Sequence, residues 1–142
     1  MNCKSIILEK FMDKEQLAQM IDQTLLTQTA TYEQTEAFCK EARTYGFASV
    51  CINPVYIPLA AKILAGSATK VCTVIDFPLG AGGTELKKTD AVNAVKAGAD
   101  EVDLVVVRNA DNVAHHVGRE AADGLLLGRD AVGISLGPLL RM

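Results

Sequence analysis

The sequence predicts an α/β protein of the (β/α)-barrel type, and three observations lead to this class. Three apolar segments centred near Cys51, Val74 and Leu104 each follow a helical segment and a glycine. Their centres lie 23 and 30 residues apart, which is the spacing of βα units that join parallel strands through right-handed crossovers. Polar residues lie on the strands or directly after them: Asp22, Asn53, Asp76 and Asp103. Polar groups at the carboxyl ends of parallel strands are typical of a barrel, whose chemistry lies on that face.

The chain opens with a segment that precedes the barrel part. Residues 1–13 carry no clear pattern, and we expect them to form a poorly fixed arm. From Lys14 to Met20 the pattern is helical, and the short apolar segment at residues 21–26 is a candidate first strand. We therefore expect the barrel part to begin at residue 14.

Local signals predict the next helix and strand. Thr31 and Gln34 have the spacing of a capping box, and apolar residues recur at helical intervals until Gly46, which stops the helix. These signals predict a helix from Tyr32 to Tyr45. A short strand over residues 47–52 follows it.

The remaining elements repeat this order. We expect a short helix from Ile57 to Leu64 and a buried strand from Val71 to Phe77. Residues 78–83 form a glycine-rich loop, and Thr84 is expected to cap a helix that runs to about Ala97.

An open doubly wound sheet is the competing architecture. The GxGxxG fingerprint is missing, and the loop at residues 80–83 lacks the Gly-Lys-Ser/Thr ending of a P-loop, so nothing indicates a nucleotide crevice. The backbone amides of this loop could cradle a phosphate, but a flexible βα loop is the interpretation that we favour. The polar residues at the strand ends favour the barrel.

One carboxylate, Asp103, interrupts the apolar strand that runs from residue 101 through Val107. A strand that is apolar on both faces is typical of a buried parallel strand, so we expect Asp103 to lie inside. A buried charge is costly without a cationic partner or a shifted pKa. Asp103 is therefore a candidate functional residue, although structural ion pairs produce the same pattern.

Composition favours one globular domain. The 142 residues are 49% hydrophobic and 22% charged, with a formal net charge of −3. No cluster of basic residues interleaved with aromatics is present, so we expect no nucleic-acid partner. The first residues do not resemble a signal peptide and no apolar run is long enough to span a bilayer, so we expect no membrane association and a cytoplasmic protein.

The cysteines and histidines give no metal signal in the sequence. The four cysteines (Cys3, Cys39, Cys51 and Cys72) include no CxxC pair and lack the close spacing of a zinc site. We expect free thiols, with Cys51 and Cys72 packing as small apolar residues in their strands. The adjacent His115 and His116 point in different directions on a helix or a strand, so we expect no metal site there.

Four segments of the chain resemble deoxyribose-phosphate aldolases, in the same order and at the same spacing. They are Ile-Asp-Gln-Thr-Leu-Leu at 21–26, Tyr-Gly-Phe-Ala-Ser-Val-Cys-Ile-Asn-Pro at 45–54, Val-Cys-Thr-Val-Ile-Asp-Phe-Pro-Leu-Gly at 71–80 and Gly-Ala-Asp-Glu-Val-Asp at 98–103. The resemblance covers about residues 20 to 107.

The resemblance implies a (β/α)8 TIM-barrel aldolase that needs neither metal nor other cofactor. In this family a lysine forms a Schiff base with acetaldehyde, and the derived enamine adds to glyceraldehyde 3-phosphate to give 2-deoxyribose 5-phosphate, a reversible step of deoxyribonucleotide catabolism. The acid/base aspartate of the family falls on Asp103, and Asp22 and Cys51 fall on positions that line its active site. The partners implied are small aldehydes and phosphosugars, in a chain that can also form homo-oligomers.

Two departures from the family pattern lie next to this region. Asp76 stands where the family usually has glycine before Phe-Pro-Leu-Gly, so its charge either disturbs the site or is solvated at the strand end. Gly82 and Gly83 stand where Asn-Thr is more usual, which predicts a looser loop.

The resemblance stops after Val107. The lysine motifs of the family are absent from the 142 residues, which hold about three βα units of a barrel that takes about 250 residues. Four of the chain's own lysines, expected at a strand start or on helix surfaces, do not match the nucleophile: Lys70, Lys87, Lys88 and Lys96. Residues 108–142 form a tail of uncertain structure, which suggests a truncated or frame-shifted aldolase. The alternative function is a non-catalytic partial barrel that persists as a fragment or as an oligomer subunit.

Overall fold

The computed structural model describes residues 13–105 and 133–135, and these form one parallel sheet with helices. The strands follow one another in space as they do in the chain, in the order β1-β2-β3-β4-β5. Their bounds are Asp22–Leu25 (β1), Ser49–Ile52 (β2), Lys70–Ile75 (β3), Glu101–Leu104 (β4) and Gly133–Ser135 (β5). All four pairings are parallel, as βα units require.

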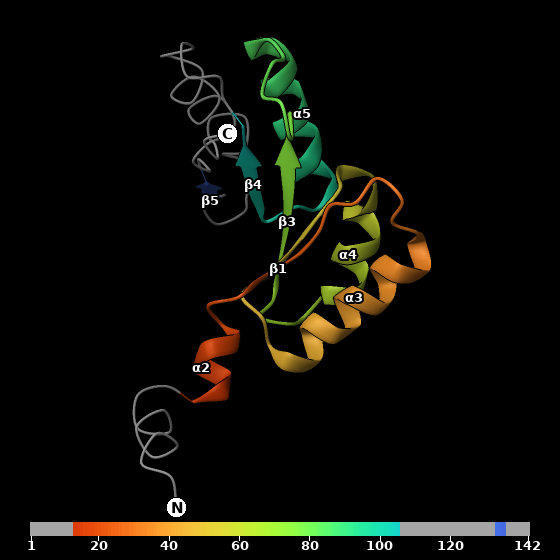
Figure 1. The fold of residues 1–142 in the computed structure, drawn as a ribbon, viewed down its shortest axis with the longest axis vertical. Coiled ribbons are helices and arrows are strands. Elements are labelled where there is room, and N and C mark those ends of the chain that lie inside the picture. The colour runs from red at the N-terminus through yellow and green to blue at the C-terminus, as the bar shows by residue number, and fades with distance from the viewer. Residues whose placement is uncertain (1–12, 106–132, 136–142) are drawn as a thin grey trace, which may run out of the picture.

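The helices that connect the strands lie together on one side of the sheet, whereas the first helix precedes β1 and lies apart from them (Figure 1). The helices are α2 (Lys14–Ala18), α3 (Tyr32–Tyr45), the 3-10 helix η1 (Pro54–Tyr56), α4 (Ile57–Leu64) and α5 (Thr84–Ala97). The helix α3 joins β1 to β2, α4 joins β2 to β3, and α5 joins β3 to β4. The α/β class and the three crossovers predicted from the sequence are confirmed.

The predicted bounds of α3 are confirmed because its end signals are local. The Thr31 hydroxyl accepts a hydrogen bond from the Gln34 backbone N–H at 3.2 Å, and the Gln34 side chain accepts one from the Thr31 N–H at 2.9 Å. Gly46 ends the helix in the left-handed conformation at φ 68°. The prediction that Thr84 caps α5 is wrong: Thr84 is the first residue of that helix, and Gly83 is its N-cap without a side-chain cap.

The strands are shorter than the sequence predicts. In the turn after α3 the Phe47 N–H donates a hydrogen bond to the Ala42 carbonyl at 3.1 Å, so β2 begins only at Ser49. The strand β3 ends at Ile75, because the backbone of Asp76 turns into the left-handed region at φ 56°. Asp76 therefore lies directly after the strand rather than within it.

The two faces of the sheet differ in what covers them. On the outer face, apolar strand residues pack against α3, α4 and α5 in one core that includes Val50, Ile52, Val71, Ile75, Val102 and Leu104. Burying an aliphatic side chain of this size contributes about 1.5–3 kcal/mol. The inner face carries a smaller cluster formed by Cys51, Cys72 and Val74. Packing thus fixes the strands from one side and leaves the other for polar groups.

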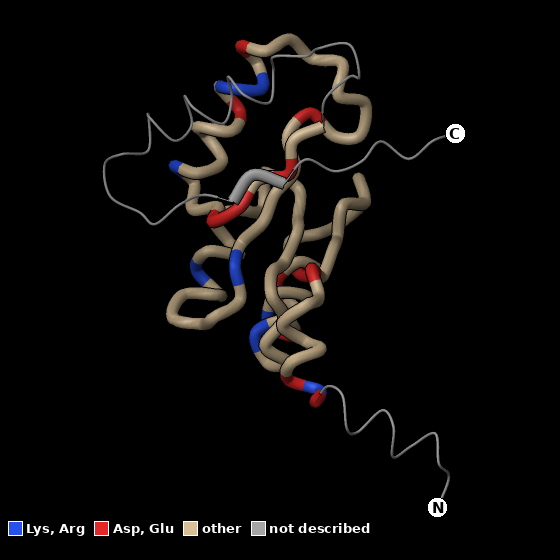
Figure 2. The backbone as a smooth tube through the Cα atoms, turned by 90° about the vertical axis from the view of Figure 1, so that its left-hand side faces the viewer, with Lys and Arg blue, Asp and Glu red and all other residues tan. Residues whose placement is uncertain are grey.

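Charged residues are distributed along the described chain rather than gathered in one stretch. Basic and acidic segments alternate over the helices and loops in Figure 2. Within the part of the chain that the structure describes, no helix combines the length and the apolar character needed to cross a membrane. Residues 1–12 of the predicted arm, His115 and His116, and most of the predicted tail lie outside the described residues. Asp13, the last residue of that arm, is the N-cap of α2, and only β5 of the tail is described.

Candidate active site on the inner face of the sheet

Four side chains from four consecutive strands meet on the inner face. Asp22 on β1, Cys51 on β2, Cys72 on β3 and Asp103 on β4 each place one carboxylate oxygen or sulfur atom within 4.8 Å of the others. The register explains the convergence, since Cys51 pairs with Cys72 and side chains on a strand alternate between its faces. The structure therefore brings together the three site residues predicted from the sequence and adds Cys72.

Burial within this cluster is uneven. Cys51 and Cys72 are both 2% exposed, whereas Asp103 is half-buried and Asp22 is exposed. The expectation that Asp103 lies fully inside is therefore wrong. Its neighbours Val102 and Leu104 point to the helices, while Asp103 points to the inner face, which the helices do not cover. The cationic partner expected for Asp103 stays a prediction.

The thiol of Cys51 affects the pKa of the neighbouring Cys72 thiol. A hydrogen bond with the Cys51 thiol raises the pKa of Cys72, and burial and the negative charges of Asp103 and Asp22 raise it further. The Cys72 thiol is thus protonated at neutral pH. Both thiols are free, as the sequence analysis expects.

A hydroxyl from the neighbouring strand positions Asp22. Ser49 lies opposite Asp22 in the β1–β2 register, and its hydroxyl donates a hydrogen bond to the Asp22 carboxylate. Ser49 is 4% exposed, so packing fixes this donor. Such outer contacts hold a functional carboxylate in one orientation.

A second charged group lies at the carboxyl end of β3. The Lys87 Nζ atom contacts the Asp76 carboxylate at 2.9 Å and donates a hydrogen bond to the Gly80 carbonyl at 2.6 Å. Lys87 is 1% exposed, so the expectation that it lies on a helix surface is wrong. It shares the sheet-facing side of α5 with Ala91 and Ala94, one and two turns further along. The Lys87 ammonium group therefore contacts the loop that follows β3 and is shielded from solvent.

The carboxylate of Asp76 is bound by protein groups and only partly exposed, with 18% of its side chain accessible. It pairs with Lys87, and it accepts a hydrogen bond from the Gly82 backbone N–H at 2.7 Å. A Cβ atom at position 82 would lie 2.9 Å from the same carboxylate oxygen. The glycine at 82 therefore leaves room for the aspartate at 76, and the loop is tied down by this contact.

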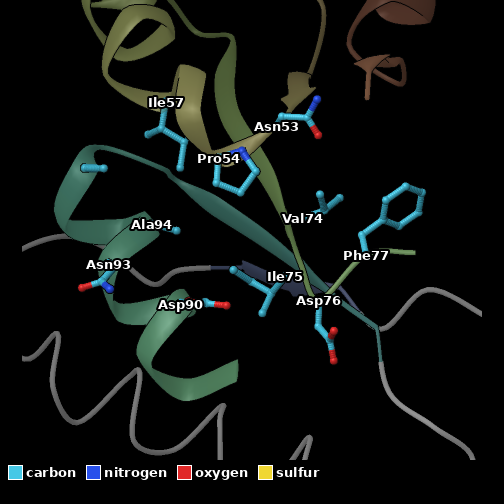
Figure 3. A pocket seen from close by; sticks show the side chains of 11 residues that line it. Asn53, Pro54, Ile57, Val74, Ile75, Asp76, Phe77, Asp90, Asn93 and Ala94 are labelled. Carbon is cyan, nitrogen blue, oxygen red and sulfur yellow. The ribbon is translucent and has the colours of Figure 1, made fainter. Parts of the chain in front are cut away.

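A cavity of about 470 Å³ lies beside this loop (Figure 3). Asp90, Asn93 and Ala94 reach it from α5, and Asn53 reaches it from the end of β2. None of the four clustered residues lines it. The cavity and the inner-face cluster are thus separate features of the structure.

Comparison with known proteins agrees with this geometry. The family model described as DeoC/LacD family aldolase matches residues 16–122. The chain belongs to this aldolase family. The match continues past Val107, where the motifs quoted above end, so the family similarity is longer than the sequence analysis expects.

Individual members of the aldolase family give the same result. A deoxyribose-phosphate aldolase of Clostridium kluyveri is 58% identical over 95 residues, which are 67% of this chain and 44% of that protein. Deoxyribose-phosphate aldolase 1 of Bacillus licheniformis is 44% identical over 130 residues, covering 86% of this chain and 58% of that protein. The chain therefore spans about half the length of the curated relatives it matches.

Solved aldolase structures confirm the barrel-type fold. The tetrameric deoxyribose phosphate aldolase of Aeropyrum pernix matches with a TM-score of 0.66 at 32% identity, over 89% of this chain and 54% of that chain. The predicted fold class, a (β/α) barrel present in part, is therefore confirmed.

Sequence reasoning missed Cys72 and Ser49 as members of the site. The signal for Cys72 was present, because residues 50–52 and 71–73 share the pattern Val-Cys followed by a β-branched residue. Aligning the two strands on this pattern places the thiols side by side. Ser49 carries no comparable signal, since only the β1–β2 register sets it opposite Asp22.

Proposed function

We propose that this chain supplies the acid/base part of a deoxyribose-phosphate aldolase site, a carbon–carbon lyase that cleaves 2-deoxy-D-ribose 5-phosphate reversibly to glyceraldehyde 3-phosphate and acetaldehyde. The observation that carries the proposal is the convergence of Asp22, Cys51 and Asp103 from three separate strands, in a chain of the aldolase family. Free thiols in the described part of the chain suit the reducing cytoplasm, where we place the protein.

Asp103 is the proposed proton carrier. A lysine amine adds to the acetaldehyde carbonyl, the carbinolamine loses water, and loss of a methyl proton gives the enamine that attacks the second aldehyde. Each dehydration and deprotonation step needs a general acid or base within reach, and a carboxylate can fill this role. Asp103 is half-buried, so it can meet substrate and still be shielded from bulk water. Asp22 and Cys51 lie beside it in the cluster and are the proposed substrate-contacting residues.

No lysine in the described part of the chain matches the Schiff-base lysine of the family. Lys87 is buried and held by Asp76 and the Gly80 carbonyl. Lys70 lies at the start of β3, where it pairs with Glu101 at 2.6 Å on the exterior. We therefore propose that the Schiff-base lysine comes from a later strand of a complete barrel.

The test is a chimaera that completes the barrel. Residues 1–105 are joined to the carboxyl-terminal half of the Clostridium kluyveri relative, and cleavage of 2-deoxyribose 5-phosphate is followed through the acetaldehyde released. We expect turnover, and a loss of at least about 100-fold in kcat for Asp103→Asn, the usual contribution of a general acid or base. Asp90→Asn on α5 is the control and retains activity.

Two results would count against this function. A folded chimaera without turnover would remove the proposed reaction. Near-normal turnover in the Asp103→Asn chimaera would remove Asp103 from its role and leave the reaction in place.

The second candidate is a non-catalytic partial barrel. The observation that favours it is the edge strand β1, which pairs only with β2 in the described sheet and so offers its other edge to a partner. The 142-residue chain is incubated with acetaldehyde and borohydride and weighed by intact-mass spectrometry. Both candidates predict an unmodified mass for this chain alone, whereas one reduced adduct on a single lysine contradicts a non-catalytic chain; turnover by the chimaera separates the two candidates.

A further inference from the structure

We propose that Asp22, Cys51, Cys72 and Asp103 bind one thiophilic divalent cation of the Zn²⁺ or Cd²⁺ class. Each residue contributes one ligand atom, and all four atoms lie within 4.8 Å of one another. With metal–sulfur and metal–oxygen bonds of about 2.3 and 2.1 Å, a tetrahedral site needs ligand atoms about 3.4–3.8 Å apart. The four strands therefore deliver the right number of ligands at nearly the right separation.

The two cysteines of the cluster are held rigidly, and the two aspartates are less enclosed. Cys51 and Cys72 are paired in register on adjacent strands and 2% exposed, so the backbone ladder fixes the two sulfur atoms. Asp103 is half-buried, so its carboxylate has room to turn toward a cation, whereas Asp22 is exposed and held by Ser49. The Ser49 hydroxyl holds the Asp22 carboxylate from behind, as outer contacts do in metal sites.

The donor set selects the class of cation. Two thiolates are soft ligands that favour Zn²⁺ and Cd²⁺, while Mg²⁺ and Ca²⁺ require sites made of oxygen atoms. On binding, each thiol gives its proton to water and forms a metal–sulfur bond, without any change of oxidation state. The cation enters from the inner face, where Asp22 is exposed.

This inference goes beyond the proposed aldol reaction, which uses no metal. The cation is therefore not a cofactor of that reaction. It engages Asp103, so bound metal competes with proton transfer. Only this inhibitory consequence rests on the proposed function; the binding itself does not.

Cadmium titration of the reduced 142-residue chain tests the binding directly. The chain carries Cys3→Ser, because Cys3 lies outside the described residues and would add a thiol. The charge-transfer absorption of cadmium–thiolate bonds reports sulfur ligands alone. We expect saturation at one Cd²⁺ per chain with two thiolates, and no displacement by excess Mg²⁺.

Variants separate this site from adventitious thiol binding. Cys51→Ser and Cys72→Ser should each halve the absorption, and Asp103→Asn should weaken binding at least 10-fold while both thiolates remain. Cys39→Ser is the matched control, since Cys39 is fully buried in the helical core and should leave the titration unchanged. Circular dichroism verifies that each variant is folded.

Several outcomes would overturn the site. The first is undiminished absorption in Cys51→Ser or Cys72→Ser. The second is a loss of absorption in Cys39→Ser equal to the loss in those two variants. The third is an unchanged cadmium affinity in Asp103→Asn. The readout is spectroscopic and needs no turnover. An inactive chimaera with normal cadmium binding would thus refute the proposed function alone.

Discussion

Removing the charge of Asp76 should destabilise the fold far more than removing a surface charge. Asp76→Asn keeps the size of the side chain and its acceptor for the Gly82 N–H, and asparagine tolerates the positive φ of 56°. What it removes is the negative charge 2.9 Å from the Lys87 Nζ atom. The Lys87 ammonium, 1% exposed, then has the Gly80 carbonyl and a neutral amide oxygen beside it, with no negative charge.

The magnitude follows from the burial of the pair. Removing one partner of a buried ion pair costs about 3–5 kcal/mol, because the other charge stays buried without compensation. The Asp76 side chain is 18% exposed, so water reaches one end of the pair and we expect about 3 kcal/mol. Lys87→Met added to Asp76→Asn should recover most of this loss, since no buried charge remains.

Asp76→Gly removes the backbone strain along with the charge. Glycine adopts the left-handed conformation freely, which returns about 1 kcal/mol of strain, while the ion pair is lost as in Asp76→Asn. Glycine also lacks the oxygen that accepts the hydrogen bond from the Gly82 N–H, which costs about 1 kcal/mol, so we expect Asp76→Gly to be about as destabilising as Asp76→Asn. The residue usual in the family would still be worse for this chain than its own aspartate.

The assay is reversible unfolding in urea, with the free energy of unfolding extrapolated to water. Glu36→Gln is the matched control, because Glu36 and Lys40 pair at 2.6 Å with side chains 47% and 64% exposed. We expect that control to change stability by no more than about 0.5 kcal/mol. If Asp76→Asn costs no more than the control, Lys87 does not depend on Asp76 and the argument from burial is wrong.

Three further predictions concern stability. Burial raises the pKa of the Cys39 thiol from 9.0 to about 11, so the unfolded chain loses this proton at a lower pH than the folded chain. The free energy of unfolding should therefore fall by about 3 kcal/mol between those pH values. Cys39→Ala should flatten this part of the pH profile, and an unchanged profile would contradict the assignment. Thr31→Ala removes the capping hydroxyl of α3 and should cost about 1 kcal/mol, whereas Thr31→Ser should cost little; equal losses in urea unfolding would exclude the cap. Tyr56→Phe removes the hydrogen bond from the buried Tyr56 hydroxyl to the Ala30 carbonyl and should cost about 1–2 kcal/mol by the same assay; a neutral effect would mean that this bond adds nothing.

Elements with local end signals could be predicted from the sequence. The helix α3 has a capping box at Thr31 and a left-handed Gly46 at its end, so neighbouring residues alone set both bounds. The end of β3 has no such signal. It depends on Asp76 adopting a positive φ, and the contacts with Gly82 and Lys87 hold that residue across the loop.

The candidate site could be predicted only in part, for a related reason. Asp103 was a candidate from the apolar pattern of its strand and again from the family resemblance, and the resemblance added Asp22 and Cys51, while Cys72 looked like an apolar strand residue. Rules for metal sites search for ligands that are close in sequence, and these four are distributed from residue 22 to 103. Parallel strands bring such residues together through register, which no single segment reveals.

Lys87 shows the limit of residue-type rules. Lysine is almost never fully buried unless it is paired, so a lysine on a helix is ordinarily assigned to the surface. Here the carboxylate that pairs with it lies on another element, at a position where the family resemblance leads one to expect glycine. The unusual residue at 76 was visible in the sequence, but its partner was not.

Side chains at positions 76 and 82 would occupy the same space, and this restricts the order in which the two residues can be substituted. A Cβ atom at 82 would approach the Asp76 carboxylate to 2.9 Å, so a chain with both side chains must turn that carboxylate away from Lys87. A chain with glycine at both positions meets no such conflict. A lineage that starts from the usual family residues therefore reaches this sequence most easily by acquiring Gly82 before Asp76. Anyone restoring the family loop by mutagenesis should reverse the steps and replace Asp76 first.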